Sequence, residues 1–584
     1  MRAQLPLFMS VTCLALLLVL PFVLPFNTLP VTTFYQEWVA FALGSIVFVA
    51  GLWWQRGEAI VIPRTVILPA GLCVLLLAQA LMGRLGYWQV GTLGVIYLVW
   101  SIVMLCAGAT LYRHLGADLF CVTCAWAFCI GALISAATGL VQLAGWQPGG
   151  LVMSMIGPRV HANLAQPNHF AAYLCLGLFS LCYLYAANRI NVYFAAVLVA
   201  LMLLAADVSG SRSVWAYLVA GLLLAGWTHY RARTRQTRLL GYSVLAVFVG
   251  MVVVSMLTTA LNDQGVVSAD VLRGAHSQGA RMLSDVAGVS HRRSIWSAAW
   301  RIFESAPVAG AGFGGFAWAY FRLAGRLPAG QPEEIVDHAH NVALQMLAEF
   351  GLPGAILLIG AAIAWGVVAM RTRAGLHSWW ALALVAVIGL YSMVGYPLWY
   401  AYFLGVFAML VGALDRPVWQ LAPSRLSRIA IIGAGAIMAW ALVSVLVDYR
   451  LAERLGIESA ATRDNRGLIV EAARASHASL FGHLIELGIV RTIALDQTAI
   501  DAKAELNARV LRVFPAPDVA YRQSALYALQ GDIGAALPAW DLAARAYPGH
   551  AGAMAEMLAA RLAAGEVMLA PLVEYAASRN RGTQ

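Results

Sequence analysis

The sequence predicts an all-α polytopic membrane protein with about thirteen transmembrane helices, a large loop on one face and a C-terminal helical domain outside the membrane. Hydrophobic residues make up 61% of the 584 residues and charged residues only 11%, and the mean hydropathy is +0.75. A water-soluble fold of this length has too little interior for so much apolar surface, so the bilayer must act as the solvent. Apolar runs of about 18 to 24 residues recur between short polar segments, and each is long enough to cross about 30 Å of hydrocarbon as a helix.

The apolar runs place the thirteen spans along the chain. Arg2 precedes the first run, as in a signal peptide. The run is nevertheless predicted to be a retained span, because it is long, contains Pro21 and Pro25 and lacks a small-x-small cleavage site. The spans centre near 9–26, 38–54, 64–82, 89–111, 117–141, 170–187, 191–207, 214–228, 239–260, 344–369, 378–394, 398–414 and 429–447.

Arginine positions predict which connections face the cytoplasm. With Arg2 inside, every second connection is basic, which is the positive-inside pattern. The segments at about 143–168 and 261–343, and everything after about 448, are then periplasmic. The arginines of the predicted cytoplasmic connections are Arg56, Arg64, Arg113, Arg189, Arg231, Arg233, Arg235, Arg238, Arg371, Arg373, Arg416, Arg425 and Arg428.

Charge and cysteine usage argue against a nucleic-acid-binding protein and against a disulfide framework in the long periplasmic segments. The net charge of +10 follows from topology and does not predict a nucleic-acid partner. All eight cysteines fall in or beside predicted spans, so no disulfide framework is expected in the long periplasmic segments. Cys121 and Cys124 form a CxxC inside an apolar helix. Helix packing is favoured there, because redox and zinc sites need a polar, accessible setting.

Three segments interrupt the alternation of helix and short loop. The first is PRVHANLAQPNHF, before the sixth span. The second is 261–343, which is too long for a simple connector and is therefore expected to be functional. It contains RRSIWSAAWRIFES, with apolar residues at helical spacing, and then the glycine-rich AGAGFGGF. No lysine follows these glycines and no strand precedes them, so a re-entrant or interfacial bend is favoured over a phosphate-binding loop.

The third segment is the tail, about 449–584, which has helical periodicity. Its QGDIGAALPAWDLAARAYPGH is similar to the second half of a tetratricopeptide repeat (TPR), with Gly531, Ala536, Ala543 and Pro548 near the expected spacing. Stacked helix pairs of this kind commonly bind peptides or partner proteins.

Polar side chains gather on the predicted periplasmic face. Snorkelling arginines and packed histidines would explain them without a function, whereas an anionic ligand would explain the arginines through bidentate binding of phosphate. His338 and His340 could ligate zinc, but a third ligand is not apparent, so no metal site is predicted. The spans hold almost no central carboxylates, unlike those of ion-coupled transporters. The set comprises Arg159, His161, Gln166, Asn168, His169, Arg212, Arg292, Arg293, His338, His340 and Asn341.

The segment DHAHNVALQMLAEFGLPGA resembles the signature of the Wzy/WaaL superfamily of O-antigen polymerases and ligases. In that pattern a histidine and an asparagine open a helix, and a glutamate and a glycine follow about two turns later. His340, Asn341, Glu349 and Gly351 match it. RRSIW followed by APVAGAGFGGF is similar to the superfamily's outer loop, and SGSRS, with Arg212, to its arginine-bearing turn.

Within the superfamily, ANLAQPNHFAAYL resembles the hallmark of the PglL-type protein O-oligosaccharyltransferases. YPLWYAYFLG is similar to that branch's late tyrosine motif, although Tyr396 precedes the proline where many relatives carry an acidic residue, which leaves the role of this segment open. The resemblance covers about residues 5–450 well and the tail loosely.

The resemblance implies a transmembrane glycosyltransferase domain over 1–448, including the loop 261–343, and a periplasmic TPR-like domain over 449–584, in a Gram-negative inner membrane. It implies transfer in one block of a glycan from undecaprenyl pyrophosphate to Ser/Thr hydroxyls of pilin or another exported protein. We expect an inverting, metal-independent reaction with no cofactor. The expected partners are the lipid-linked donor, the acceptor protein and membrane lipid.

The resemblance also implies roles for individual residues. His340 is the expected general base, and Arg212 and Arg292 the residues that stabilise the leaving pyrophosphate. The expected substrate-binding residues are Arg159, Gln166, Asn168, His169, Arg293, His338, Asn341, Tyr400 and Tyr402.

Other interpretations remain open at this point. An O-antigen ligase or polymerase of the same superfamily is the first, and AQPNH and the tail argue against it. A lipid-linked glycan flippase is the second, for which a charged central cavity would be expected. His340 could also serve only to cap its helix.

Overall fold

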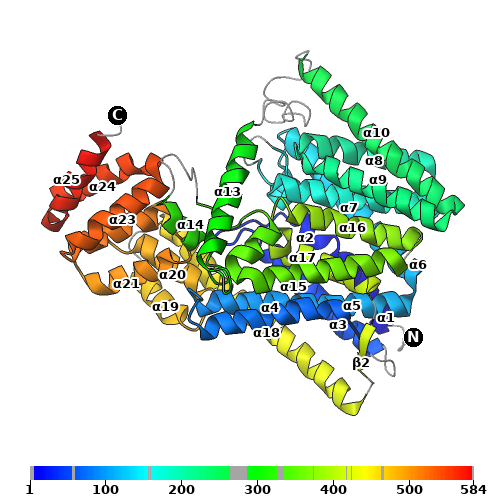
Figure 1. Ribbon diagram of the computed structural model, residues 1–584, viewed down its shortest axis with the longest axis horizontal. Coiled ribbons are helices and arrows are strands. Elements are labelled where there is room, and N and C mark those ends of the chain that lie inside the picture. The colour runs from blue at the N-terminus through cyan, green and yellow to red at the C-terminus, as the bar shows by residue number, and fades with distance from the viewer. Residues whose placement is uncertain are drawn as a thin grey trace. The chain divides into compact units, whose positions relative to one another are not determined.

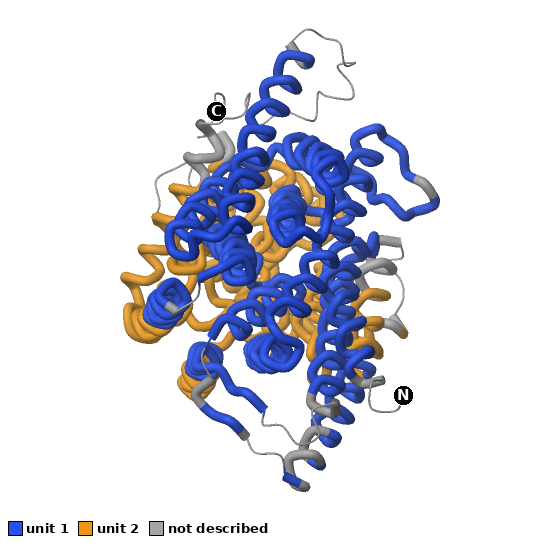
Figure 2. Tube along the Cα trace, turned by 90° about the vertical axis from the view of Figure 1, so that its right-hand side faces the viewer, with its two compact units in different colours: residues 1–71, 97–286, 359–443 blue, residues 72–96, 287–358, 444–584 orange. Residues whose placement is uncertain are grey.

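The structure, a computed structural model, describes residues 5–54, 60–155, 157, 159–263, 286–324, 326, 335–372, 374–415, 417–421, 424–461 and 466–581. The described chain is nearly all helical (Figure 1). It divides into two compact units (Figure 2): unit 1 is residues 1–71, 97–286 and 359–443, and unit 2 is residues 72–96, 287–358 and 444–584. Parts of the predicted outer loop, 264–285 and 327–334, and the arginines Arg56, Arg373 and Arg416 lie outside the described residues.

Helices fill both units. Those of unit 1 are α1 (Leu5–Leu17), α2 (Leu20–Val23), α3 (Phe34–Trp54), α6 (Ala117–Leu143), α7 (Pro167–Ala186), α8 (Val192–Val208), α9 (Ser213–Ala232), α10 (Arg235–Asp263), α16 (Leu376–Ser392) and α17 (Ala401–Leu414). Those of unit 2 are α13 (Val286–Ser305), α14 (Phe316–Ala324), α19 (Arg466–Ser476), α20 (Gly482–Thr492), α21 (Ile500–Leu511), α22 (Pro517–Leu529), α23 (Ile533–Ala546), α24 (Ala551–Ala563) and α25 (Ala570–Arg581). Four helices have several residues in each unit: α4 (Ile67–Leu81), α5 (Trp88–Leu115), α15 (Val342–Thr372) and α18 (Arg425–Ala461).

Each predicted apolar segment coincides with helical structure. Among the described residues, eight helices are long and apolar enough to cross a membrane, and four further apolar helices are shorter. The predicted eighth span corresponds to α9, which belongs to neither group. The chain is therefore a multi-pass membrane protein.

The first predicted span differs from a single helix. Instead of running through 9–26, the chain forms α1 and α2 with a break at residues 18–19. Pro21 lies in the first turn of α2, where its missing N–H costs nothing, whereas inside a longer helix its ring would clash with the carbonyl of Leu17. The proline therefore divides the span.

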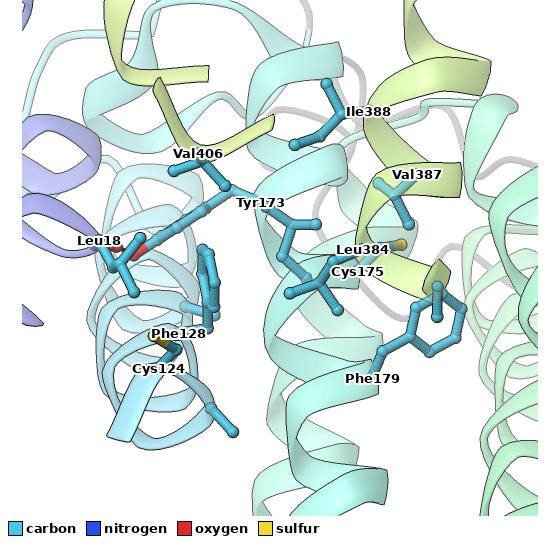
Figure 3. Close-up of a cluster of buried hydrophobic side chains, with 14 of the residues drawn as sticks. Leu18, Cys124, Phe128, Tyr173, Cys175, Phe179, Leu384, Val387, Ile388 and Val406 are labelled. Atoms are coloured by element: carbon cyan, nitrogen blue, oxygen red, sulfur yellow. Dashed lines mark hydrogen bonds between the residues drawn. The ribbon is translucent and has the colours of Figure 1, made fainter. Parts of the chain in front are cut away.

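Unit 1 is built around α7, which packs against α6, α8, α9, α10 and α16. Its residues are apolar on all sides and 17 of the 20 are buried, which places the helix at the centre of the unit. Tyr173 stacks on Phe22 with the ring centroids 4.1 Å apart. It also donates a hydrogen bond to Leu18 O at 2.7 Å (Figure 3). Cys121 and Cys124 are fully buried in α6, and all eight cysteines are unpaired. The first turn of α7 is consequently held by a packed core.

Contacts between the connections of unit 1 form two sets. In one, β1 (Ile60–Pro63) pairs antiparallel with β2 (Pro417–Leu421), Arg189 Nη2 lies 2.8 Å from Asp118 Oδ2, and Arg231 Nη2 donates to Arg371 O at 3.3 Å. In the other, Asn163 Nδ2 donates to Val23 O at 2.9 Å, and Arg159 Nε donates to Ser209 O at 3.0 Å. Each contact joins two connections that the arginine pattern assigns to the same face of the membrane.

Unit 2 joins the tail to the connection before α5. Tyr87 donates a hydrogen bond to Glu486 Oε2 at 2.5 Å, and Gln89 Nε2 donates to Ser476 O at 3.3 Å. The long predicted loop contributes α14, whose Phe321 lies in the hydrophobic core of the tail. The tail helices therefore share their core with the loop helix.

One helix pair of the tail lies where the TPR-like pattern falls. α22 and α23 pack together, and Gly531 lies in the turn between them with a φ of +82°. Ala536 and Ala543 are fully buried, and Ser524 donates a hydrogen bond to Ala536 O at 2.8 Å. The small residues thus lie at the contact between helices.

Candidate functional site

The first turn of α7 carries the AQPNH segment in unit 1. Gln166 caps the helix, because its Oε1 accepts a hydrogen bond from His169 N at 2.7 Å. The same oxygen accepts a hydrogen bond from the hydroxyl of Tyr391 at 2.9 Å. Pro167 follows at the first helical position, where its fixed φ favours helix initiation. Gln166 therefore ties the start of α7 to α16.

Asn168 ties the same turn to the arginine-bearing turn SGSRS. Its Oδ1 accepts hydrogen bonds from Ser211 Oγ at 2.8 Å and from Arg159 Nη2 at 3.3 Å. Arg159 Nε is bound in addition to Ser209 O at 3.0 Å. Two donors of Arg159 are thus used inside the protein, where they join the turn at Ser209 to Asn168.

Arg212 is the N-cap residue of α9 and is half-buried. The turn before it is closed by Gly210, which has a φ of +61°. The N-terminus of a helix has free N–H groups and a positive dipole end, so an arginine at this position adds to a potential that favours anions. The geometry of this end of unit 1 suits a phosphate group.

The predicted aromatic residues lie beside this cluster. His169 is buried and its ring stands perpendicular to Tyr400 with the centroids 4.4 Å apart. Tyr402 is 1% exposed and packs against Phe22, whereas Tyr400 is half-buried and stacks on Tyr396. Tyr400 is therefore the predicted tyrosine that retains accessible surface.

Glu37 is a buried acidic residue that the sequence analysis did not single out. Its carboxyl group accepts hydrogen bonds from Ala401 N at 2.8 Å, from Thr33 Oγ1 at 2.9 Å and from the hydroxyl of Tyr97. These bonds fix the start of α17, and with it the adjacent Tyr400. The signal available in the sequence is a carboxylate at the start of an otherwise apolar span.

His161 lies in the loop before α7 and is fully buried. Its backbone N–H donates to Gln142 Oε1 at 3.0 Å, and its Nδ1 lies 2.8 Å from Ala162 O. Burial lowers the pKa of the imidazole. The residue supports the fold of this loop.

In unit 2, His340 precedes α15 in a left-handed backbone conformation with a φ of +51°. The helix is capped by the next residue, because Asn341 Oδ1 accepts hydrogen bonds from Ala343 N and Leu344 N, both at 3.1 Å. The side-chain cap of α15 is therefore provided by Asn341. His340 is held in a conformation that is uncommon for non-glycine residues, and such outliers cluster at functional sites.

His338 is paired with Asp337, whose Oδ1 lies 2.9 Å from Nδ1 of the imidazole. The charge of His338 and its hydrogen bond hold the pKa of the exposed Asp337 carboxyl group below its ordinary value. His338 therefore has a local electrostatic partner of its own.

Gly351 interrupts α15 two turns after the cap. It has a φ of +66° and a ψ of −160°, and Pro353 follows it, so the helical hydrogen bonds fail at this point. The glycine-rich turn supplies the missing partners: Ala311 N donates to Ala348 O at 2.8 Å, and Gly312 N donates to Glu349 O at 3.1 Å. The glycine-rich segment thus forms a turn that supplies hydrogen-bond partners to the interrupted helix.

Glu349 fastens the same turn through its side chain. It is 2% exposed, and its Oε1 accepts a hydrogen bond from Gly314 N at 3.0 Å. Gln79 Nε2 donates to Glu349 O at 2.7 Å, and Gln79 Oε1 accepts from Phe313 N at 3.1 Å. Glu349 and Gly351 therefore have a structural basis, which is to hold the turn against α15.

Arg292 and Arg293 lie on α13, the first half-buried and the second exposed. The apolar spacing predicted for this helix is confirmed, since Ile295, Ala298, Ala299 and Ile302 form one buried face with Ala348 of α15. Through this packing α13 contacts α15, the helix that His340 precedes.

The predicted site residues fall into two groups. Unit 1 holds Arg159, Gln166, Asn168, His169, Arg212, Tyr400 and Tyr402, and unit 2 holds Arg292, Arg293, His338, His340 and Asn341. Within the described residues, no group of three or more His, Cys, Asp or Glu side chains is arranged to hold a metal ion.

Three family models match the chain. Residues 161–185 match the protein glycosylation ligases, 195–359 the O-antigen ligases, and 379–561 the C-terminal part of virulence-factor membrane-bound polymerases. The first match spans the cap of α7, and the second spans Arg212, Arg292 and His340.

Two curated relatives come from Acinetobacter baylyi (strain ATCC 33305 / BD413 / ADP1). The chain is 25% identical to a general O-oligosaccharyltransferase over 418 residues, which cover 70% of each chain. It is 27% identical to a ComP-specific O-oligosaccharyltransferase over 204 residues, which cover 35% of this chain and 37% of the relative.

The fold is that of a multi-pass membrane protein, and the matches show that the chain is similar to O-antigen ligases, membrane-bound polymerases and protein glycosylation ligases. The matches support a PglL-type protein glycosylation ligase within the Wzy/WaaL superfamily of O-antigen ligases and polymerases.

Proposed function

We propose that this protein transfers an oligosaccharide in one block from undecaprenyl pyrophosphate to serine or threonine hydroxyls of exported proteins such as pilin. Both curated relatives are named O-oligosaccharyltransferases, and the match to protein glycosylation ligases covers the AQPNH segment. The observation that carries the proposal is the geometry at the start of α15, where Asn341 caps the helix and the adjacent His340 is held in a left-handed conformation.

In the proposed reaction His340 is the general base. A hydroxyl is a poor nucleophile at neutral pH, and histidine is the side chain that accepts a proton most readily in this range. The hydroxyl proton passes to the imidazole as the oxygen attacks C1 of the sugar. The C1–O bond to the pyrophosphate breaks, and its electron pair leaves with the phosphate oxygen. Direct displacement inverts the anomeric configuration.

Arginines stabilise the leaving group in this proposal. Guanidinium groups bind phosphate oxygens in pairs and remain charged throughout the physiological pH range. Arg212, at the N-terminus of α9, and Arg292, on α13, are assigned this role, so that the protein itself supplies the positive charge and the reaction is metal-independent. Arg159 supports Arg212 by holding its turn through Ser209 O and Asn168.

The remaining predicted residues bind or position the substrates. Tyr400, with its accessible face, is proposed to contact the sugar or the acceptor, and the buried His169 and Tyr402 support it. Gln166, Asn168 and Asn341 position their turns through the hydrogen bonds described above. Arg293 and His338 are proposed to bind substrate.

We also propose the topology of thirteen spans in a Gram-negative inner membrane, with the site on the periplasmic face. The contacts between connections support the alternation, because each joins segments assigned to one face. In unit 2, the tail contacts the connection before α5, which the same pattern assigns to the periplasm. The TPR-like tail, 449–584, is then placed to bind the acceptor protein.

An O-antigen ligase is the second candidate, because residues 195–359 match that family. Intact-mass spectrometry of periplasmic proteins from strains with and without this gene distinguishes the two. Glycan-sized mass differences on protein, dependent on the gene, are the expected result. Loss of O-antigen from lipopolysaccharide with unchanged protein masses would favour the ligase and reject our proposal.

A further inference from the structure

The turn between α9 and α10 carries an arginine cluster that the proposed reaction does not use. It borders an open cavity of about 650 Å³ lined by Gly226, His229, Tyr230, Arg233, Thr234, Arg235 and Arg238. The volume is within the range typical of small-molecule sites, about 300–1,000 Å³. α9 has 20 residues, so this turn lies about 30 Å along the helix from Arg212. The cavity is therefore separate from the arginine cluster at the other end of α9.

The chain segment that forms this cavity is basic and contains no acidic residue. No aspartate or glutamate occurs between Asp207 and Asp263 in the sequence. Among the residues that the structure describes, no ion pair involves Arg233, Arg235 or Arg238, and all three are exposed. The N-terminus of α10 adds its positive dipole end, since the helix begins at Arg235. The cavity consequently suits a phosphate anion.

The surroundings of the cavity are those of a membrane interface. Tyr230 is 71% exposed and Trp227 precedes it by one turn, and such aromatic residues are typical of headgroup depth. Exposed apolar side chains continue from the cavity along both helices, with Leu223 on α9 and Tyr242 and Leu245 on α10 at helical spacing. This strip gives acyl chains a surface directly beside the anion site.

We propose that this cavity binds the headgroup of an acidic membrane phospholipid, with its phosphate between Arg233, Arg235 and Arg238 and its acyl chains along the exposed apolar strip. Basic pockets between transmembrane helices are known to select anionic lipid headgroups. Positive-inside topology explains why arginines occur on this connection, but it does not require a cavity with an apolar strip. The site would anchor the α9–α10 hairpin to the bilayer.

The test uses the purified full-length protein in an uncharged detergent. Thermal unfolding is followed during titration with dihexanoyl phosphatidylglycerol, dihexanoyl phosphatidylcholine and glycerol 1-phosphate. We expect saturable stabilisation by phosphatidylglycerol, little by phosphatidylcholine, and weak binding of glycerol 1-phosphate. Equal stabilisation by phosphatidylcholine would reject a phosphate-selective site, and glycerol 1-phosphate binding as tightly as the lipid would show a soluble ligand instead.

Matched variants locate the site. An arginine near an anionic surface contributes about fivefold in affinity, so R235Q/R238Q should weaken phosphatidylglycerol binding about 30-fold. R64Q/R113Q removes two exposed arginines assigned to the same face away from the cavity and should leave the affinity within about twofold. R235K/R238K should retain most binding, which separates loss of charge from misfolding. Equal weakening by R64Q/R113Q would overturn the proposal.

Discussion

Gly351→Ala tests the structural basis of the break in α15. The backbone at Gly351 has a φ of +66° and a ψ of −160°, a region that is essentially restricted to glycine. A Cβ atom there would lie 2.5 Å from Val308 O and 2.6 Å from Pro307 O. Both obstacles are backbone atoms, so the glycine-rich segment or α15 must move to accommodate the methyl group.

The expected loss of stability in Gly351→Ala has two sources, backbone strain and lost hydrogen bonds. The backbone conformation costs a non-glycine residue about 1–3 kcal/mol. Displacement would also break the bond from Leu352 N to Pro307 O, now 2.8 Å, and each buried group left unsatisfied costs about 1–3 kcal/mol. We therefore expect Gly351→Ala to destabilise the protein by about 2–6 kcal/mol and to reduce glycan transfer.

Gly360→Ala is the matched control in the same helix. A Cβ at Gly360 would meet nothing within 4 Å, and alanine is favoured over glycine in a helix interior by about 0.5–1 kcal/mol. The assay is thermal unfolding of both purified variants, with in-vitro glycan transfer in parallel. If Gly351→Ala unfolds at the same temperature as Gly360→Ala and transfers glycan normally, the docking of the glycine-rich turn is not what stabilises this region.

Three further predictions follow from other parts of the molecule. Arg212→Lys and Arg292→Lys should each lose most transfer activity while remaining folded, because an ammonium group does not reproduce bidentate binding of pyrophosphate; normal turnover by both variants would remove the arginines from the donor site. A reporter that functions only in the cytoplasm should be active when fused at Arg235 and silent at Gly531, and activity at Gly531 would change the number of spans by one. Glu37→Ala should lower stability by about 1–3 kcal/mol, because it leaves buried donors without an acceptor; thermal unfolding unchanged from the parent protein would show that the start of α17 is held by other contacts.

Local patterns predicted the elements whose causes are local. The apolar runs fixed the helices, and the spacing of apolar residues in RRSIWSAAWRIFES gave the buried face of α13. One interpretation of the sequence assigned the cap at the start of α15 to His340. The cap is Asn341, whose short side chain reaches the amides of Ala343 and Leu344.

Contacts between residues far apart in the chain could not be predicted from the sequence. Glu37 binds the backbone of Ala401, which lies 364 positions later, and no periodicity relates the two. Phe321 of the long loop lies in the hydrophobic core of the tail, although the boundary near 449 was drawn from local composition alone. Pro21 was visible in the first predicted span, but the sequence did not show where a new helix would begin. In the structure Pro21 lies in the first turn of α2, and the span is divided into α1 and α2.

His340→Gln measures the central claim most directly. Purified variants are compared for transfer to a serine-containing acceptor, for donor binding and for thermal unfolding, with His338→Gln as the adjacent control and Asn341→Ala as the cap control. We predict that His340→Gln unfolds like the parent protein, binds the lipid-linked donor and loses about 10²–10⁴ in turnover. His338→Gln should be milder, and Asn341→Ala should lose about 0.5–2 kcal/mol of stability. Near-normal turnover by His340→Gln would contradict the assignment of the base, and loss of donor binding would instead place His340 at the pyrophosphate.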